Sequence, residues 1–322
     1  MIDGLALVDK EPGWTSHDVV AKVRRLLGQR RVGHAGTLDP GATGLLLIGL
    51  GRATRLLRFL SGQPKRYVGE VVLGVTTSTL DADGDVTARF DMGAITLDDV
   101  DAAAAALTGP ILQVPPMVSA VRVDGRRLHQ LARQGIEVER QARPVTIHRL
   151  VVRPTTEPGV FGIDVSCSSG TYVRSLAADL GAALGGGAHL RALRRLSIGS
   201  FDVDQAVTVE GLCPERVLPP AEALRDMPSV TVEGEVAREV AHGAMMEPAA
   251  LAPAGLDAAA LGPAALGSGR PAGLAGTAGP AGPAGDGPWA VLDRSGELLA
   301  VYSWAGEPGG RVKPLVVLAR RD

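Results

Sequence analysis

Residues 31–50 read RVGHAGTLDPGATGLLLIGL and hold one acid, Asp39. Three glycines surround this acid, so the backbone can turn sharply there and approach a ligand closely. Pro40 biases Asp39 towards extended geometry, and the apolar run at 45–48 is typical of a buried strand. The segment therefore predicts a carboxylate held on a stiff loop at the edge of a sheet.

Two interpretations of this loop remain open on spacing alone. Asp-Pro-Gly is common in ordinary turns, and a histidine such as His34 in a loop is often a packing residue. No Gly-Lys-Ser/Thr follows the glycines, which excludes a phosphate-binding P-loop. A plain turn and a catalytic loop both fit these residues.

The distribution of charge says more than its total. The chain has 322 residues, which suggests two domains, and its net charge of −2 argues at first against a polyanionic partner. The charge balance is +6 over residues 1–66, +4 over residues 122–149 and −10 over residues 202–308. A basic catalytic part with an acidic C-terminal part fits a polyanion bound on one face. Solvated basic helix faces are the alternative.

Other patterns exclude several classes of protein. Cys167 and Cys213 have no metal-like or redox-like spacing and are expected to be reduced thiols. The Asp-x-Asp-Gly-Asp sequence at 81–85 resembles the start of a calcium loop, but no glutamate follows at the required distance, so no metal is expected. There is no charged-then-apolar leader and no apolar run long enough to span a bilayer. We expect a soluble cytoplasmic protein without a membrane partner.

Hydrophobic spacing predicts a mixed α and β chain. Ser16 is the expected N-cap of the first helix, because its hydroxyl can accept a bond from the first turn. Expected strands lie at 4–9, 65–73, 145–152 and 160–168, expected helices at 17–27, 53–60, 97–107 and 171–184, and an extended arginine-rich segment at 189–198.

Two regions depart from this regular pattern. Residues 115–143 begin at a Pro-Pro pair and contain few apolar residues, which predicts a projecting arm or a mobile loop. A second unit begins at Pro228, with a strand, a short helix and three tail strands. Inside it, residues 249–288 hold fourteen Ala, ten Gly and six Pro. This composition lacks the bulk to form a core and predicts a disordered insert.

Several motifs together resemble one family. Gly-His-Ala-Gly-Thr-Leu-Asp-Pro at 33–40, with Ala-Thr-Gly at 42–44, is similar to the catalytic motif of the bacterial TruB family of tRNA pseudouridine synthases. The resemblance covers roughly residues 3–228. Further matches follow in the family's order: Leu-Val-Asp-Lys at 7–10, Lys-Arg-Tyr at 65–67, Gly-Thr-Tyr-Val-Arg at 170–174, Gly-Ala-His-Leu at 187–190 and Leu-Arg-Arg-Leu at 193–196.

The resemblance implies an α+β fold with two domains. The catalytic domain, residues 1–228, would have a pseudouridine-synthase-like mixed and mainly antiparallel sheet with flanking helices. A thumb-like insertion at about 115–143 would clamp RNA. Residues 229–322 would form a small PUA-like β-domain, which the insert at 249–288 interrupts. That insert departs from the family, so RNA binding by this domain stays open.

The implied reaction converts uridine 55 in the T-loop of tRNA to pseudouridine. The C1′–N1 bond breaks, the base turns, and a C1′–C5 bond forms. No oxidation state changes and no group is transferred, so neither a cofactor nor a metal is required. The expected partner is the T-arm of tRNA, and we expect a monomer with no obligate protein partner.

By the same resemblance, Asp39 is the catalytic carboxylate and Arg174 is the cation that keeps it charged. Tyr67 would pack against the flipped uracil, where stacking is worth roughly 1–3 kcal/mol, and Tyr172 would be a second pocket residue. Arg174 and the two tyrosines also have structural interpretations. Arg174 could be a solvated charge on a helix, and each tyrosine could be a ring buried in the core.

Three more residues complete the expected substrate-binding set. His34 fits a wedge that fills the space left by the flipped base. Leu193 would present backbone polar groups to the uracil edge, and Lys10 would be a supporting charge.

Alternatives to a stand-alone synthase also follow from the sequence. They are a synthase guided by other proteins or RNA, and an RNA-folding chaperone that binds tRNA without catalysis. A carbohydrate hydrolase is disfavoured because no second catalytic carboxylate is evident nearby. Whether Asp39 attacks C1′ or assists elimination is open.

Overall fold

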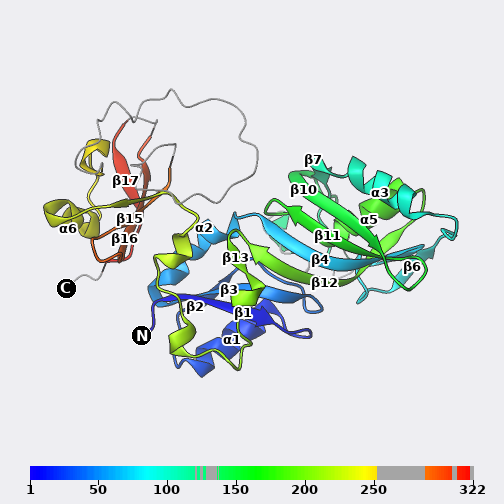
Figure 1. Cartoon of the computed structure of the whole chain (residues 1–322), viewed down its shortest axis with the longest axis horizontal. Coiled ribbons are helices and arrows are strands. Elements are labelled where there is room, and N and C mark those ends of the chain that lie inside the picture. The colour runs from blue at the N-terminus through cyan, green and yellow to red at the C-terminus, as the bar shows by residue number, and fades with distance from the viewer. Residues whose placement is uncertain are drawn as a thin grey trace.

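The computed structural model describes residues 1–119, 122–123, 126–127, 136, 138–251, 287–306 and 310–319. Residues 120–121, 124–125, 128–135 and 137 of the expected arm at 115–143, and residues 252–286 of the insert at 249–288, lie outside the described residues. At the start of that insert, Pro248–Leu251 forms a short 3₁₀ helix, η5, against the C-terminal sheet. The chain contains two main sheets with helices beside them (Figure 1).

The larger sheet has nine strands in the order β1-β3-β12-β4-β11-β10-β7, with β2 beside β3 and β13 beside β12. Every described pair in it is antiparallel except β3–β12. This confirms the mixed, mainly antiparallel sheet. The strands are β1 (Gly4–Lys10), β2 (Val32–Ala35), β3 (Thr43–Leu50), β4 (Lys65–Leu73), β7 (Gly109–Gln113), β10 (Arg143–Pro154), β11 (Val160–Cys167), β12 (Ala188–Ile198) and β13 (Phe201–Asp202).

Helices cover the sheet on more than one side. Figure 1 shows α3 (Leu97–Ala106) and α5 (Val173–Ala183) beside the β4–β11–β10 region, where they share a core with Val71 and Val165. The first helix, α1 (Ser16–Leu26), packs against β1 and β3. Alternate residues of β3 enter two different cores, which explains its unbroken apolar run.

Three local predictions differ from the structure. The N-cap of α1 is Thr15 rather than Ser16, and Thr15 forms a capping box with Asp18. Residues 32–35 form the short strand β2 instead of belonging to a loop. The helix expected at 53–60 is split into a 3₁₀ turn, η1 (Gly51–Leu56), and one turn of α-helix, α2 (Leu57–Ser61).

Smaller elements connect these layers. They are the strands β5 (Val75–Thr77), β6 (Val86–Arg89), β8 (Arg122–Val123) and β9 (Arg126–Arg127), and the 3₁₀ helices η2 (Val203–Gln205), η3 (Pro214–Arg216) and η4 (Glu222–Leu224).

The second sheet is formed by the C-terminal part. Its order is β14-β15-β16-β17, and α6 (Gly234–His242) packs on β16 and β17. Trp289 and Tyr302 fill its core. This part is β-rich, as predicted. The strands are β14 (Ser229–Thr231), β15 (Trp289–Leu292), β16 (Leu298–Trp304) and β17 (Val312–Val317).

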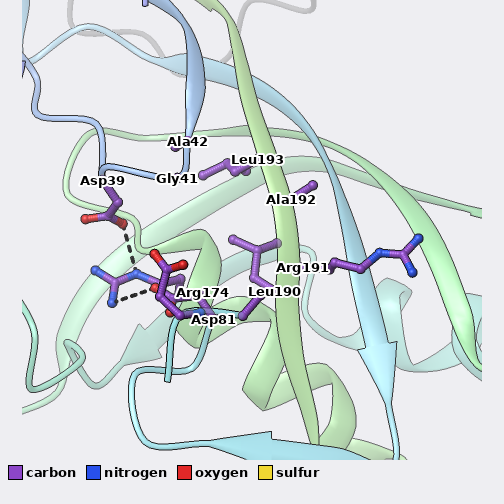
Figure 2. Close-up of a pocket in the computed structure, with 11 residues that line it drawn as sticks. Asp39, Gly41, Ala42, Asp81, Arg174, Leu190, Arg191, Ala192 and Leu193 are labelled. Carbon is purple, nitrogen blue, oxygen red and sulfur yellow. Dashed lines mark hydrogen bonds and ion pairs between the residues drawn. The ribbon is translucent and has the colours of Figure 1, made fainter. Parts of the chain in front are cut away.

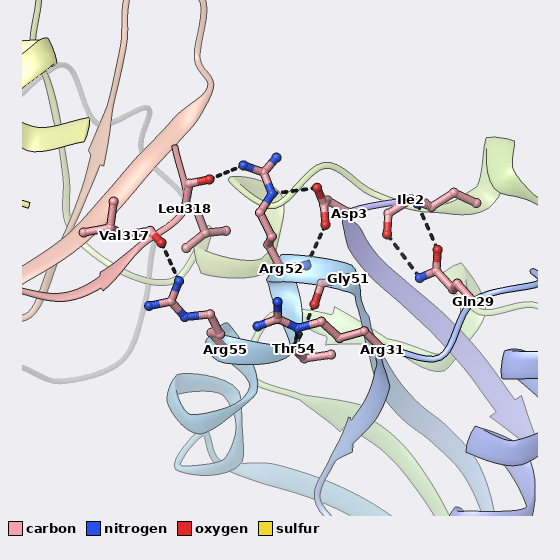
Figure 3. Close-up of polar contacts among 10 residues, drawn as sticks. All are labelled: Ile2, Asp3, Gln29, Arg31, Gly51, Arg52, Thr54, Arg55, Val317 and Leu318. Carbon is pink, nitrogen blue, oxygen red and sulfur yellow. Dashed lines mark hydrogen bonds and ion pairs between the residues drawn. The ribbon is translucent and has the colours of Figure 1, made fainter. Parts of the chain in front are cut away.

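Two arginines of η1 join the two sheets (Figure 3). Arg52 forms an ion pair with Asp3 at 2.7 Å and also donates to the carbonyl of Leu318. Arg55 Nη1 donates to the carbonyl of Val317 at 2.6 Å. An apolar cluster with members from both parts lies beside them. The C-terminal sheet is therefore anchored to the 3₁₀ helix that follows β3.

Among the helices in the described part of the chain, none has the length and apolar character needed to cross a membrane.

Candidate active site

The loop that carries Asp39 connects β2 to β3 and is held in place by a hydrogen bond to the first residue of α1. Ser16 Oγ accepts a hydrogen bond from Leu38 N at 2.9 Å and lies 3.2 Å from Leu38 O. Ser16 is therefore not the helix cap, and its hydroxyl instead holds the residue before Asp39. The backbone N–H of Gly13 also donates to Pro40 O, at 2.9 Å.

Lys10 holds the other side of the same loop. Its ammonium is fully buried and donates to the carbonyls of Trp14 at 2.7 Å and Pro40 at 3.1 Å, as well as to Glu11 at 2.9 Å. Burial lowers the pKa of Lys10 to about 8, although Asp39 acts in the opposite direction. Lys10 thus lies near Asp39, and its direct contacts are with backbone carbonyls.

Asp39 faces Arg174, as Figure 2 shows. Arg174 Nε lies 3.0 Å from Asp39 Oδ2, and the arginine side chain is 5% exposed against 43% for Asp39. Arg174 also donates to the carbonyls of Thr79 at 3.0 Å and Val118 at 2.8 Å. This guanidinium is fixed by several bonds, while the carboxylate it pairs with is open to the cleft.

Burial raises the pKa of Asp39, because the protein surrounds the carboxylate except where the cleft opens. Arg174 lowers that pKa, and the nearby Asp81 and Asp83 raise it. Arg174 therefore offsets part of the cost of an ionised Asp39.

Asp81 is a second acid at the site, which sequence reasoning considered only as a metal ligand. Its Oδ2 lies 3.4 Å from Arg174 Nη1 (Figure 2). The preceding Leu80 has a φ of 63°, in the left-handed region that favours glycine. Such strain is concentrated at functional sites. The described residues contain no group of three or more His, Cys, Asp or Glu placed to hold a metal ion.

A cleft of about 270 Å³ opens beside Asp39. Its walls come from the loop that carries Asp39, β4, β12 and the start of α5. Five of the seven residues predicted for the site line this cleft: Asp39, Tyr67, Tyr172, Arg174 and Leu193.

The ring of Tyr67 forms part of the cleft wall, and its side chain is only 7% exposed. Burial raises the pKa of its hydroxyl, so the phenol is neutral at physiological pH. Tyr172 caps α5, and its backbone N–H donates to Gln113 Oε1 at 2.7 Å. Leu193 pairs with Gly69 of β4, which has no side chain to fill the space beside it.

His34 lies on β2 and is not among the residues that line the cleft. Its ring makes an edge-to-face contact with His17 at 5.3 Å between centroids. Burial lowers its pKa to about 4, so the imidazole is neutral at pH 7. Its buried Nδ1 has no hydrogen-bond partner among the described residues.

Two charged residues of the cleft were missed from the sequence, Lys65 and Arg195. Both belong to motifs that the family resemblance had already marked, the Lys-Arg-Tyr and Leu-Arg-Arg-Leu segments. Their burial of 92% or more could not be inferred from a basic composition.

Comparison with known proteins identifies the family. The family model described as TruB family pseudouridylate synthase, N-terminal domain, matches residues 24–173, and that of the tRNA pseudouridylate synthase B C-terminal domain matches residues 174–225. A tRNA pseudouridine synthase B of Arthrobacter sp. (strain FB24) is 43% identical over 99% of this chain and 97% of its own. The chain belongs to the TruB family. It is thus a pseudouridine synthase, an isomerase.

A second relative agrees with this TruB assignment, and solved structures share the fold. The tRNA pseudouridine synthase B of Symbiobacterium thermophilum is 53% identical over 75% of this chain and 82% of its own. A Cbf5-Nop10-Gar1 complex contains a chain with a TM-score of 0.66 and 25% identity, covering 99% of this chain and 84% of that one. An H/ACA RNP bound to a substrate RNA has a chain with a TM-score of 0.68 and 23% identity, covering 99% and 86%. These structures share the pseudouridine synthase fold.

Proposed function

We propose that this TruB-family enzyme isomerises uridine 55 in the T-loop of tRNA, with Asp39 as its catalytic carboxylate. The observation that carries the proposal is the Asp39–Arg174 pair at a cleft walled by Tyr67 and Tyr172. The curated relatives are named tRNA pseudouridine synthase B, which supports tRNA as the substrate.

The target base must leave the stack before it can enter the cleft, at a cost of a few kcal/mol. Stacking of the uracil on Tyr67 contributes roughly 1–3 kcal/mol and offsets part of this cost. Leu193 then meets the uracil edge, and His34 fills the space that the base leaves in the RNA. His34 acts as a neutral wedge here, because burial keeps its pKa near 4.

Asp39 manages the positive charge that develops at C1′ as the C1′–N1 bond breaks. Arg174 orients the carboxylate and lowers its pKa against the effect of burial. Activity therefore falls as pH drops through the raised pKa of Asp39. The base turns and bonds to C1′ through C5, and the C5 proton is then lost.

We also propose that the enzyme acts alone and as a monomer. The solved neighbours lie in complexes named for Nop10 and Gar1 or for a bound RNA, whereas the names of the curated relatives mention no partner. The basic residues 1–66 would supply the phosphate contacts for an RNA recognised mainly by shape.

The test uses an unmodified tRNA transcript, wild-type protein and the Asp39→Asn variant. We expect pseudouridine at position 55 with the wild type and at least 10³-fold slower formation with Asp39→Asn, while tRNA binding is retained. A transcript with cytidine at position 55 is the matched control. Binding without conversion by the wild type would instead indicate an RNA chaperone.

A further inference from the structure

Two buried cations lie beside the catalytic loop. Lys65 is 8% exposed and Arg195 only 1%, and both line the cleft of Asp39. A Cβ placed on Gly36 would lie 3.5 Å from Lys65 Cε and 3.4 Å from Arg195 Nη1. The two side chains therefore flank the same glycine of the loop and lie close to each other.

Neither cation has a carboxylate partner among the described residues, and Arg195 also hydrogen-bonds the Tyr67 side chain. Lys65 Nζ donates to the carbonyls of Ser61 at 3.0 Å and Gln63 at 2.7 Å. Arg195 donates to the carbonyls of Leu45 at 2.7 Å and Gly36 at 2.9 Å. Throughout the described ranges, no carboxylate lies within ion-pair distance of either side chain.

Two like charges buried together without a counter-ion are unfavourable in a protein interior. The titratable groups that face Lys65 are Arg195 and the Cys167 thiol, and burial with Arg195 lowers the pKa of Lys65 to about 8. Groups perturbed in this way are concentrated at functional sites. An ammonium has three donors, and the two carbonyls use only two of them.

The position of these two cations indicates which part of the substrate they would contact. Lys65 and Tyr67 are two residues apart on β4 and point to the same face of the sheet. Arg195 of β12 is paired directly with Tyr67. The cations therefore flank the ring that would receive uracil, while Asp39 faces the sugar.

We propose that Lys65 and Arg195 stabilise the negative charge that uracil carries once it is detached from C1′. This inference rests on the proposed function. When the C1′–N1 bond breaks, its electron pair stays on N1, and the uracil anion spreads that charge over its ring and carbonyl oxygens. The anion then turns, C5 gives an electron pair to C1′, and the C5 proton leaves. No outside reactant is needed.

The decisive variants are Lys65→Met, which removes the charge at similar length, and Lys65→Arg, which keeps it. Arg153→Met, an exposed change on β10, controls for loss of one positive charge. Single-turnover pseudouridine formation in the tRNA transcript and the Kd for that tRNA are measured together. We expect a rate about 100-fold lower for Lys65→Met, the usual effect of losing one such electrostatic contact. Its Kd stays within twofold of the wild type.

Lys65→Arg should retain most of the rate, and Arg153→Met all of it. The pH dependence of the rate is a further measurement, and it would not change if Lys65 had only a structural role. From pH 7 to pH 9 the wild-type rate should fall relative to that of Lys65→Arg, because lysine loses its proton in this range and arginine does not.

Each other outcome has a clear meaning. A weaker Kd with an unchanged rate at saturation would show a phosphate contact and overturn the proposal. So would equal losses in Lys65→Met and Lys65→Arg, or parallel pH profiles. A wild type that forms no pseudouridine overturns the proposed function and this inference together. A competent wild type with a fully active Lys65→Met overturns only the inference.

Discussion

At the scale of single residues, the site is a set of buried cations held by backbone carbonyls around the more exposed carboxylate of Asp39. Asp39 and Arg174 are 135 positions apart in the chain, yet the resemblance of their two motifs to one family was enough to predict the pair. Lys65 and Arg195 were missed because their partners are main-chain oxygens of other elements. Sequence motifs can indicate an acidic and a basic side chain that form a pair. They cannot indicate which backbone carbonyls the fold brings close to a buried cation.

Replacing Asp39 should remove activity without weakening the fold. Burial raises the pKa of Asp39, so the folded protein binds this proton more tightly than the unfolded chain does. The ionised carboxylate therefore lowers stability once pH exceeds the unfolded value. We expect Asp39→Asn to melt at the same temperature as the wild type or up to a few degrees higher at pH 7. A calorimetric melting temperature more than about 3 °C lower would contradict this.

His34 should make the protein sensitive to mild acid. Its folded pKa of about 4 lies below the ordinary value of 6.5, so the unfolded chain is protonated first as pH falls. Stability from the neutral ring is complete above pH 6.5 and is lost as pH drops towards 4. His34→Phe keeps a ring beside His17 and should show a shallower loss of melting temperature between pH 6.5 and 4.5. Identical slopes in both proteins would refute this prediction.

At the scale of elements, periodicity located most strands and helices. The bounds of β4 were predicted correctly, and α3 was predicted to within one residue. β2 was missed because a four-residue strand containing a glycine has too little alternation to recognise. The parallel β3–β12 pair was not predictable either, since spacing along the chain does not reveal which strands are neighbours.

The start of α1 offers a paired test, because adjacent hydroxyls have different functions. Thr15→Ala removes the helix cap and should cost about 1 kcal/mol of stability with little change in kcat. Ser16→Ala leaves the buried N–H of Leu38 without its partner and should cost about 1–3 kcal/mol. It should also lower kcat, because Leu38 precedes Asp39. Denaturant unfolding and single-turnover rates separate the two, and equal kcat values would refute the assigned function of Ser16.

At the scale of the whole molecule, two arginines of η1 join the catalytic part to the C-terminal sheet (Figure 3). Charged donors to carbonyls contribute roughly 1.5–3 kcal/mol each, and the exposed Arg55 contributes at the low end. In the double variant Arg52→Gln with Arg55→Gln, we expect the C-terminal sheet to unfold before the rest. Calorimetry should then show two transitions where the wild type shows one. Arg58→Gln, a neighbouring exposed change, is the control, and one unshifted transition in the double variant would refute the prediction.

The place of β12 in the large sheet has a consequence for synthesis of the chain. Within the large sheet only β13 is made after β12, yet β12 lies between β3 and β4. Until residue 198 has left the ribosome, those two earlier strands face each other across a gap, with open edges that can pair wrongly. A nascent chain can form its hairpins early, but the cleft cannot close before about six-tenths of the protein exists. Slow translation just before β12 would therefore prolong the period in which this enzyme is most prone to aggregate.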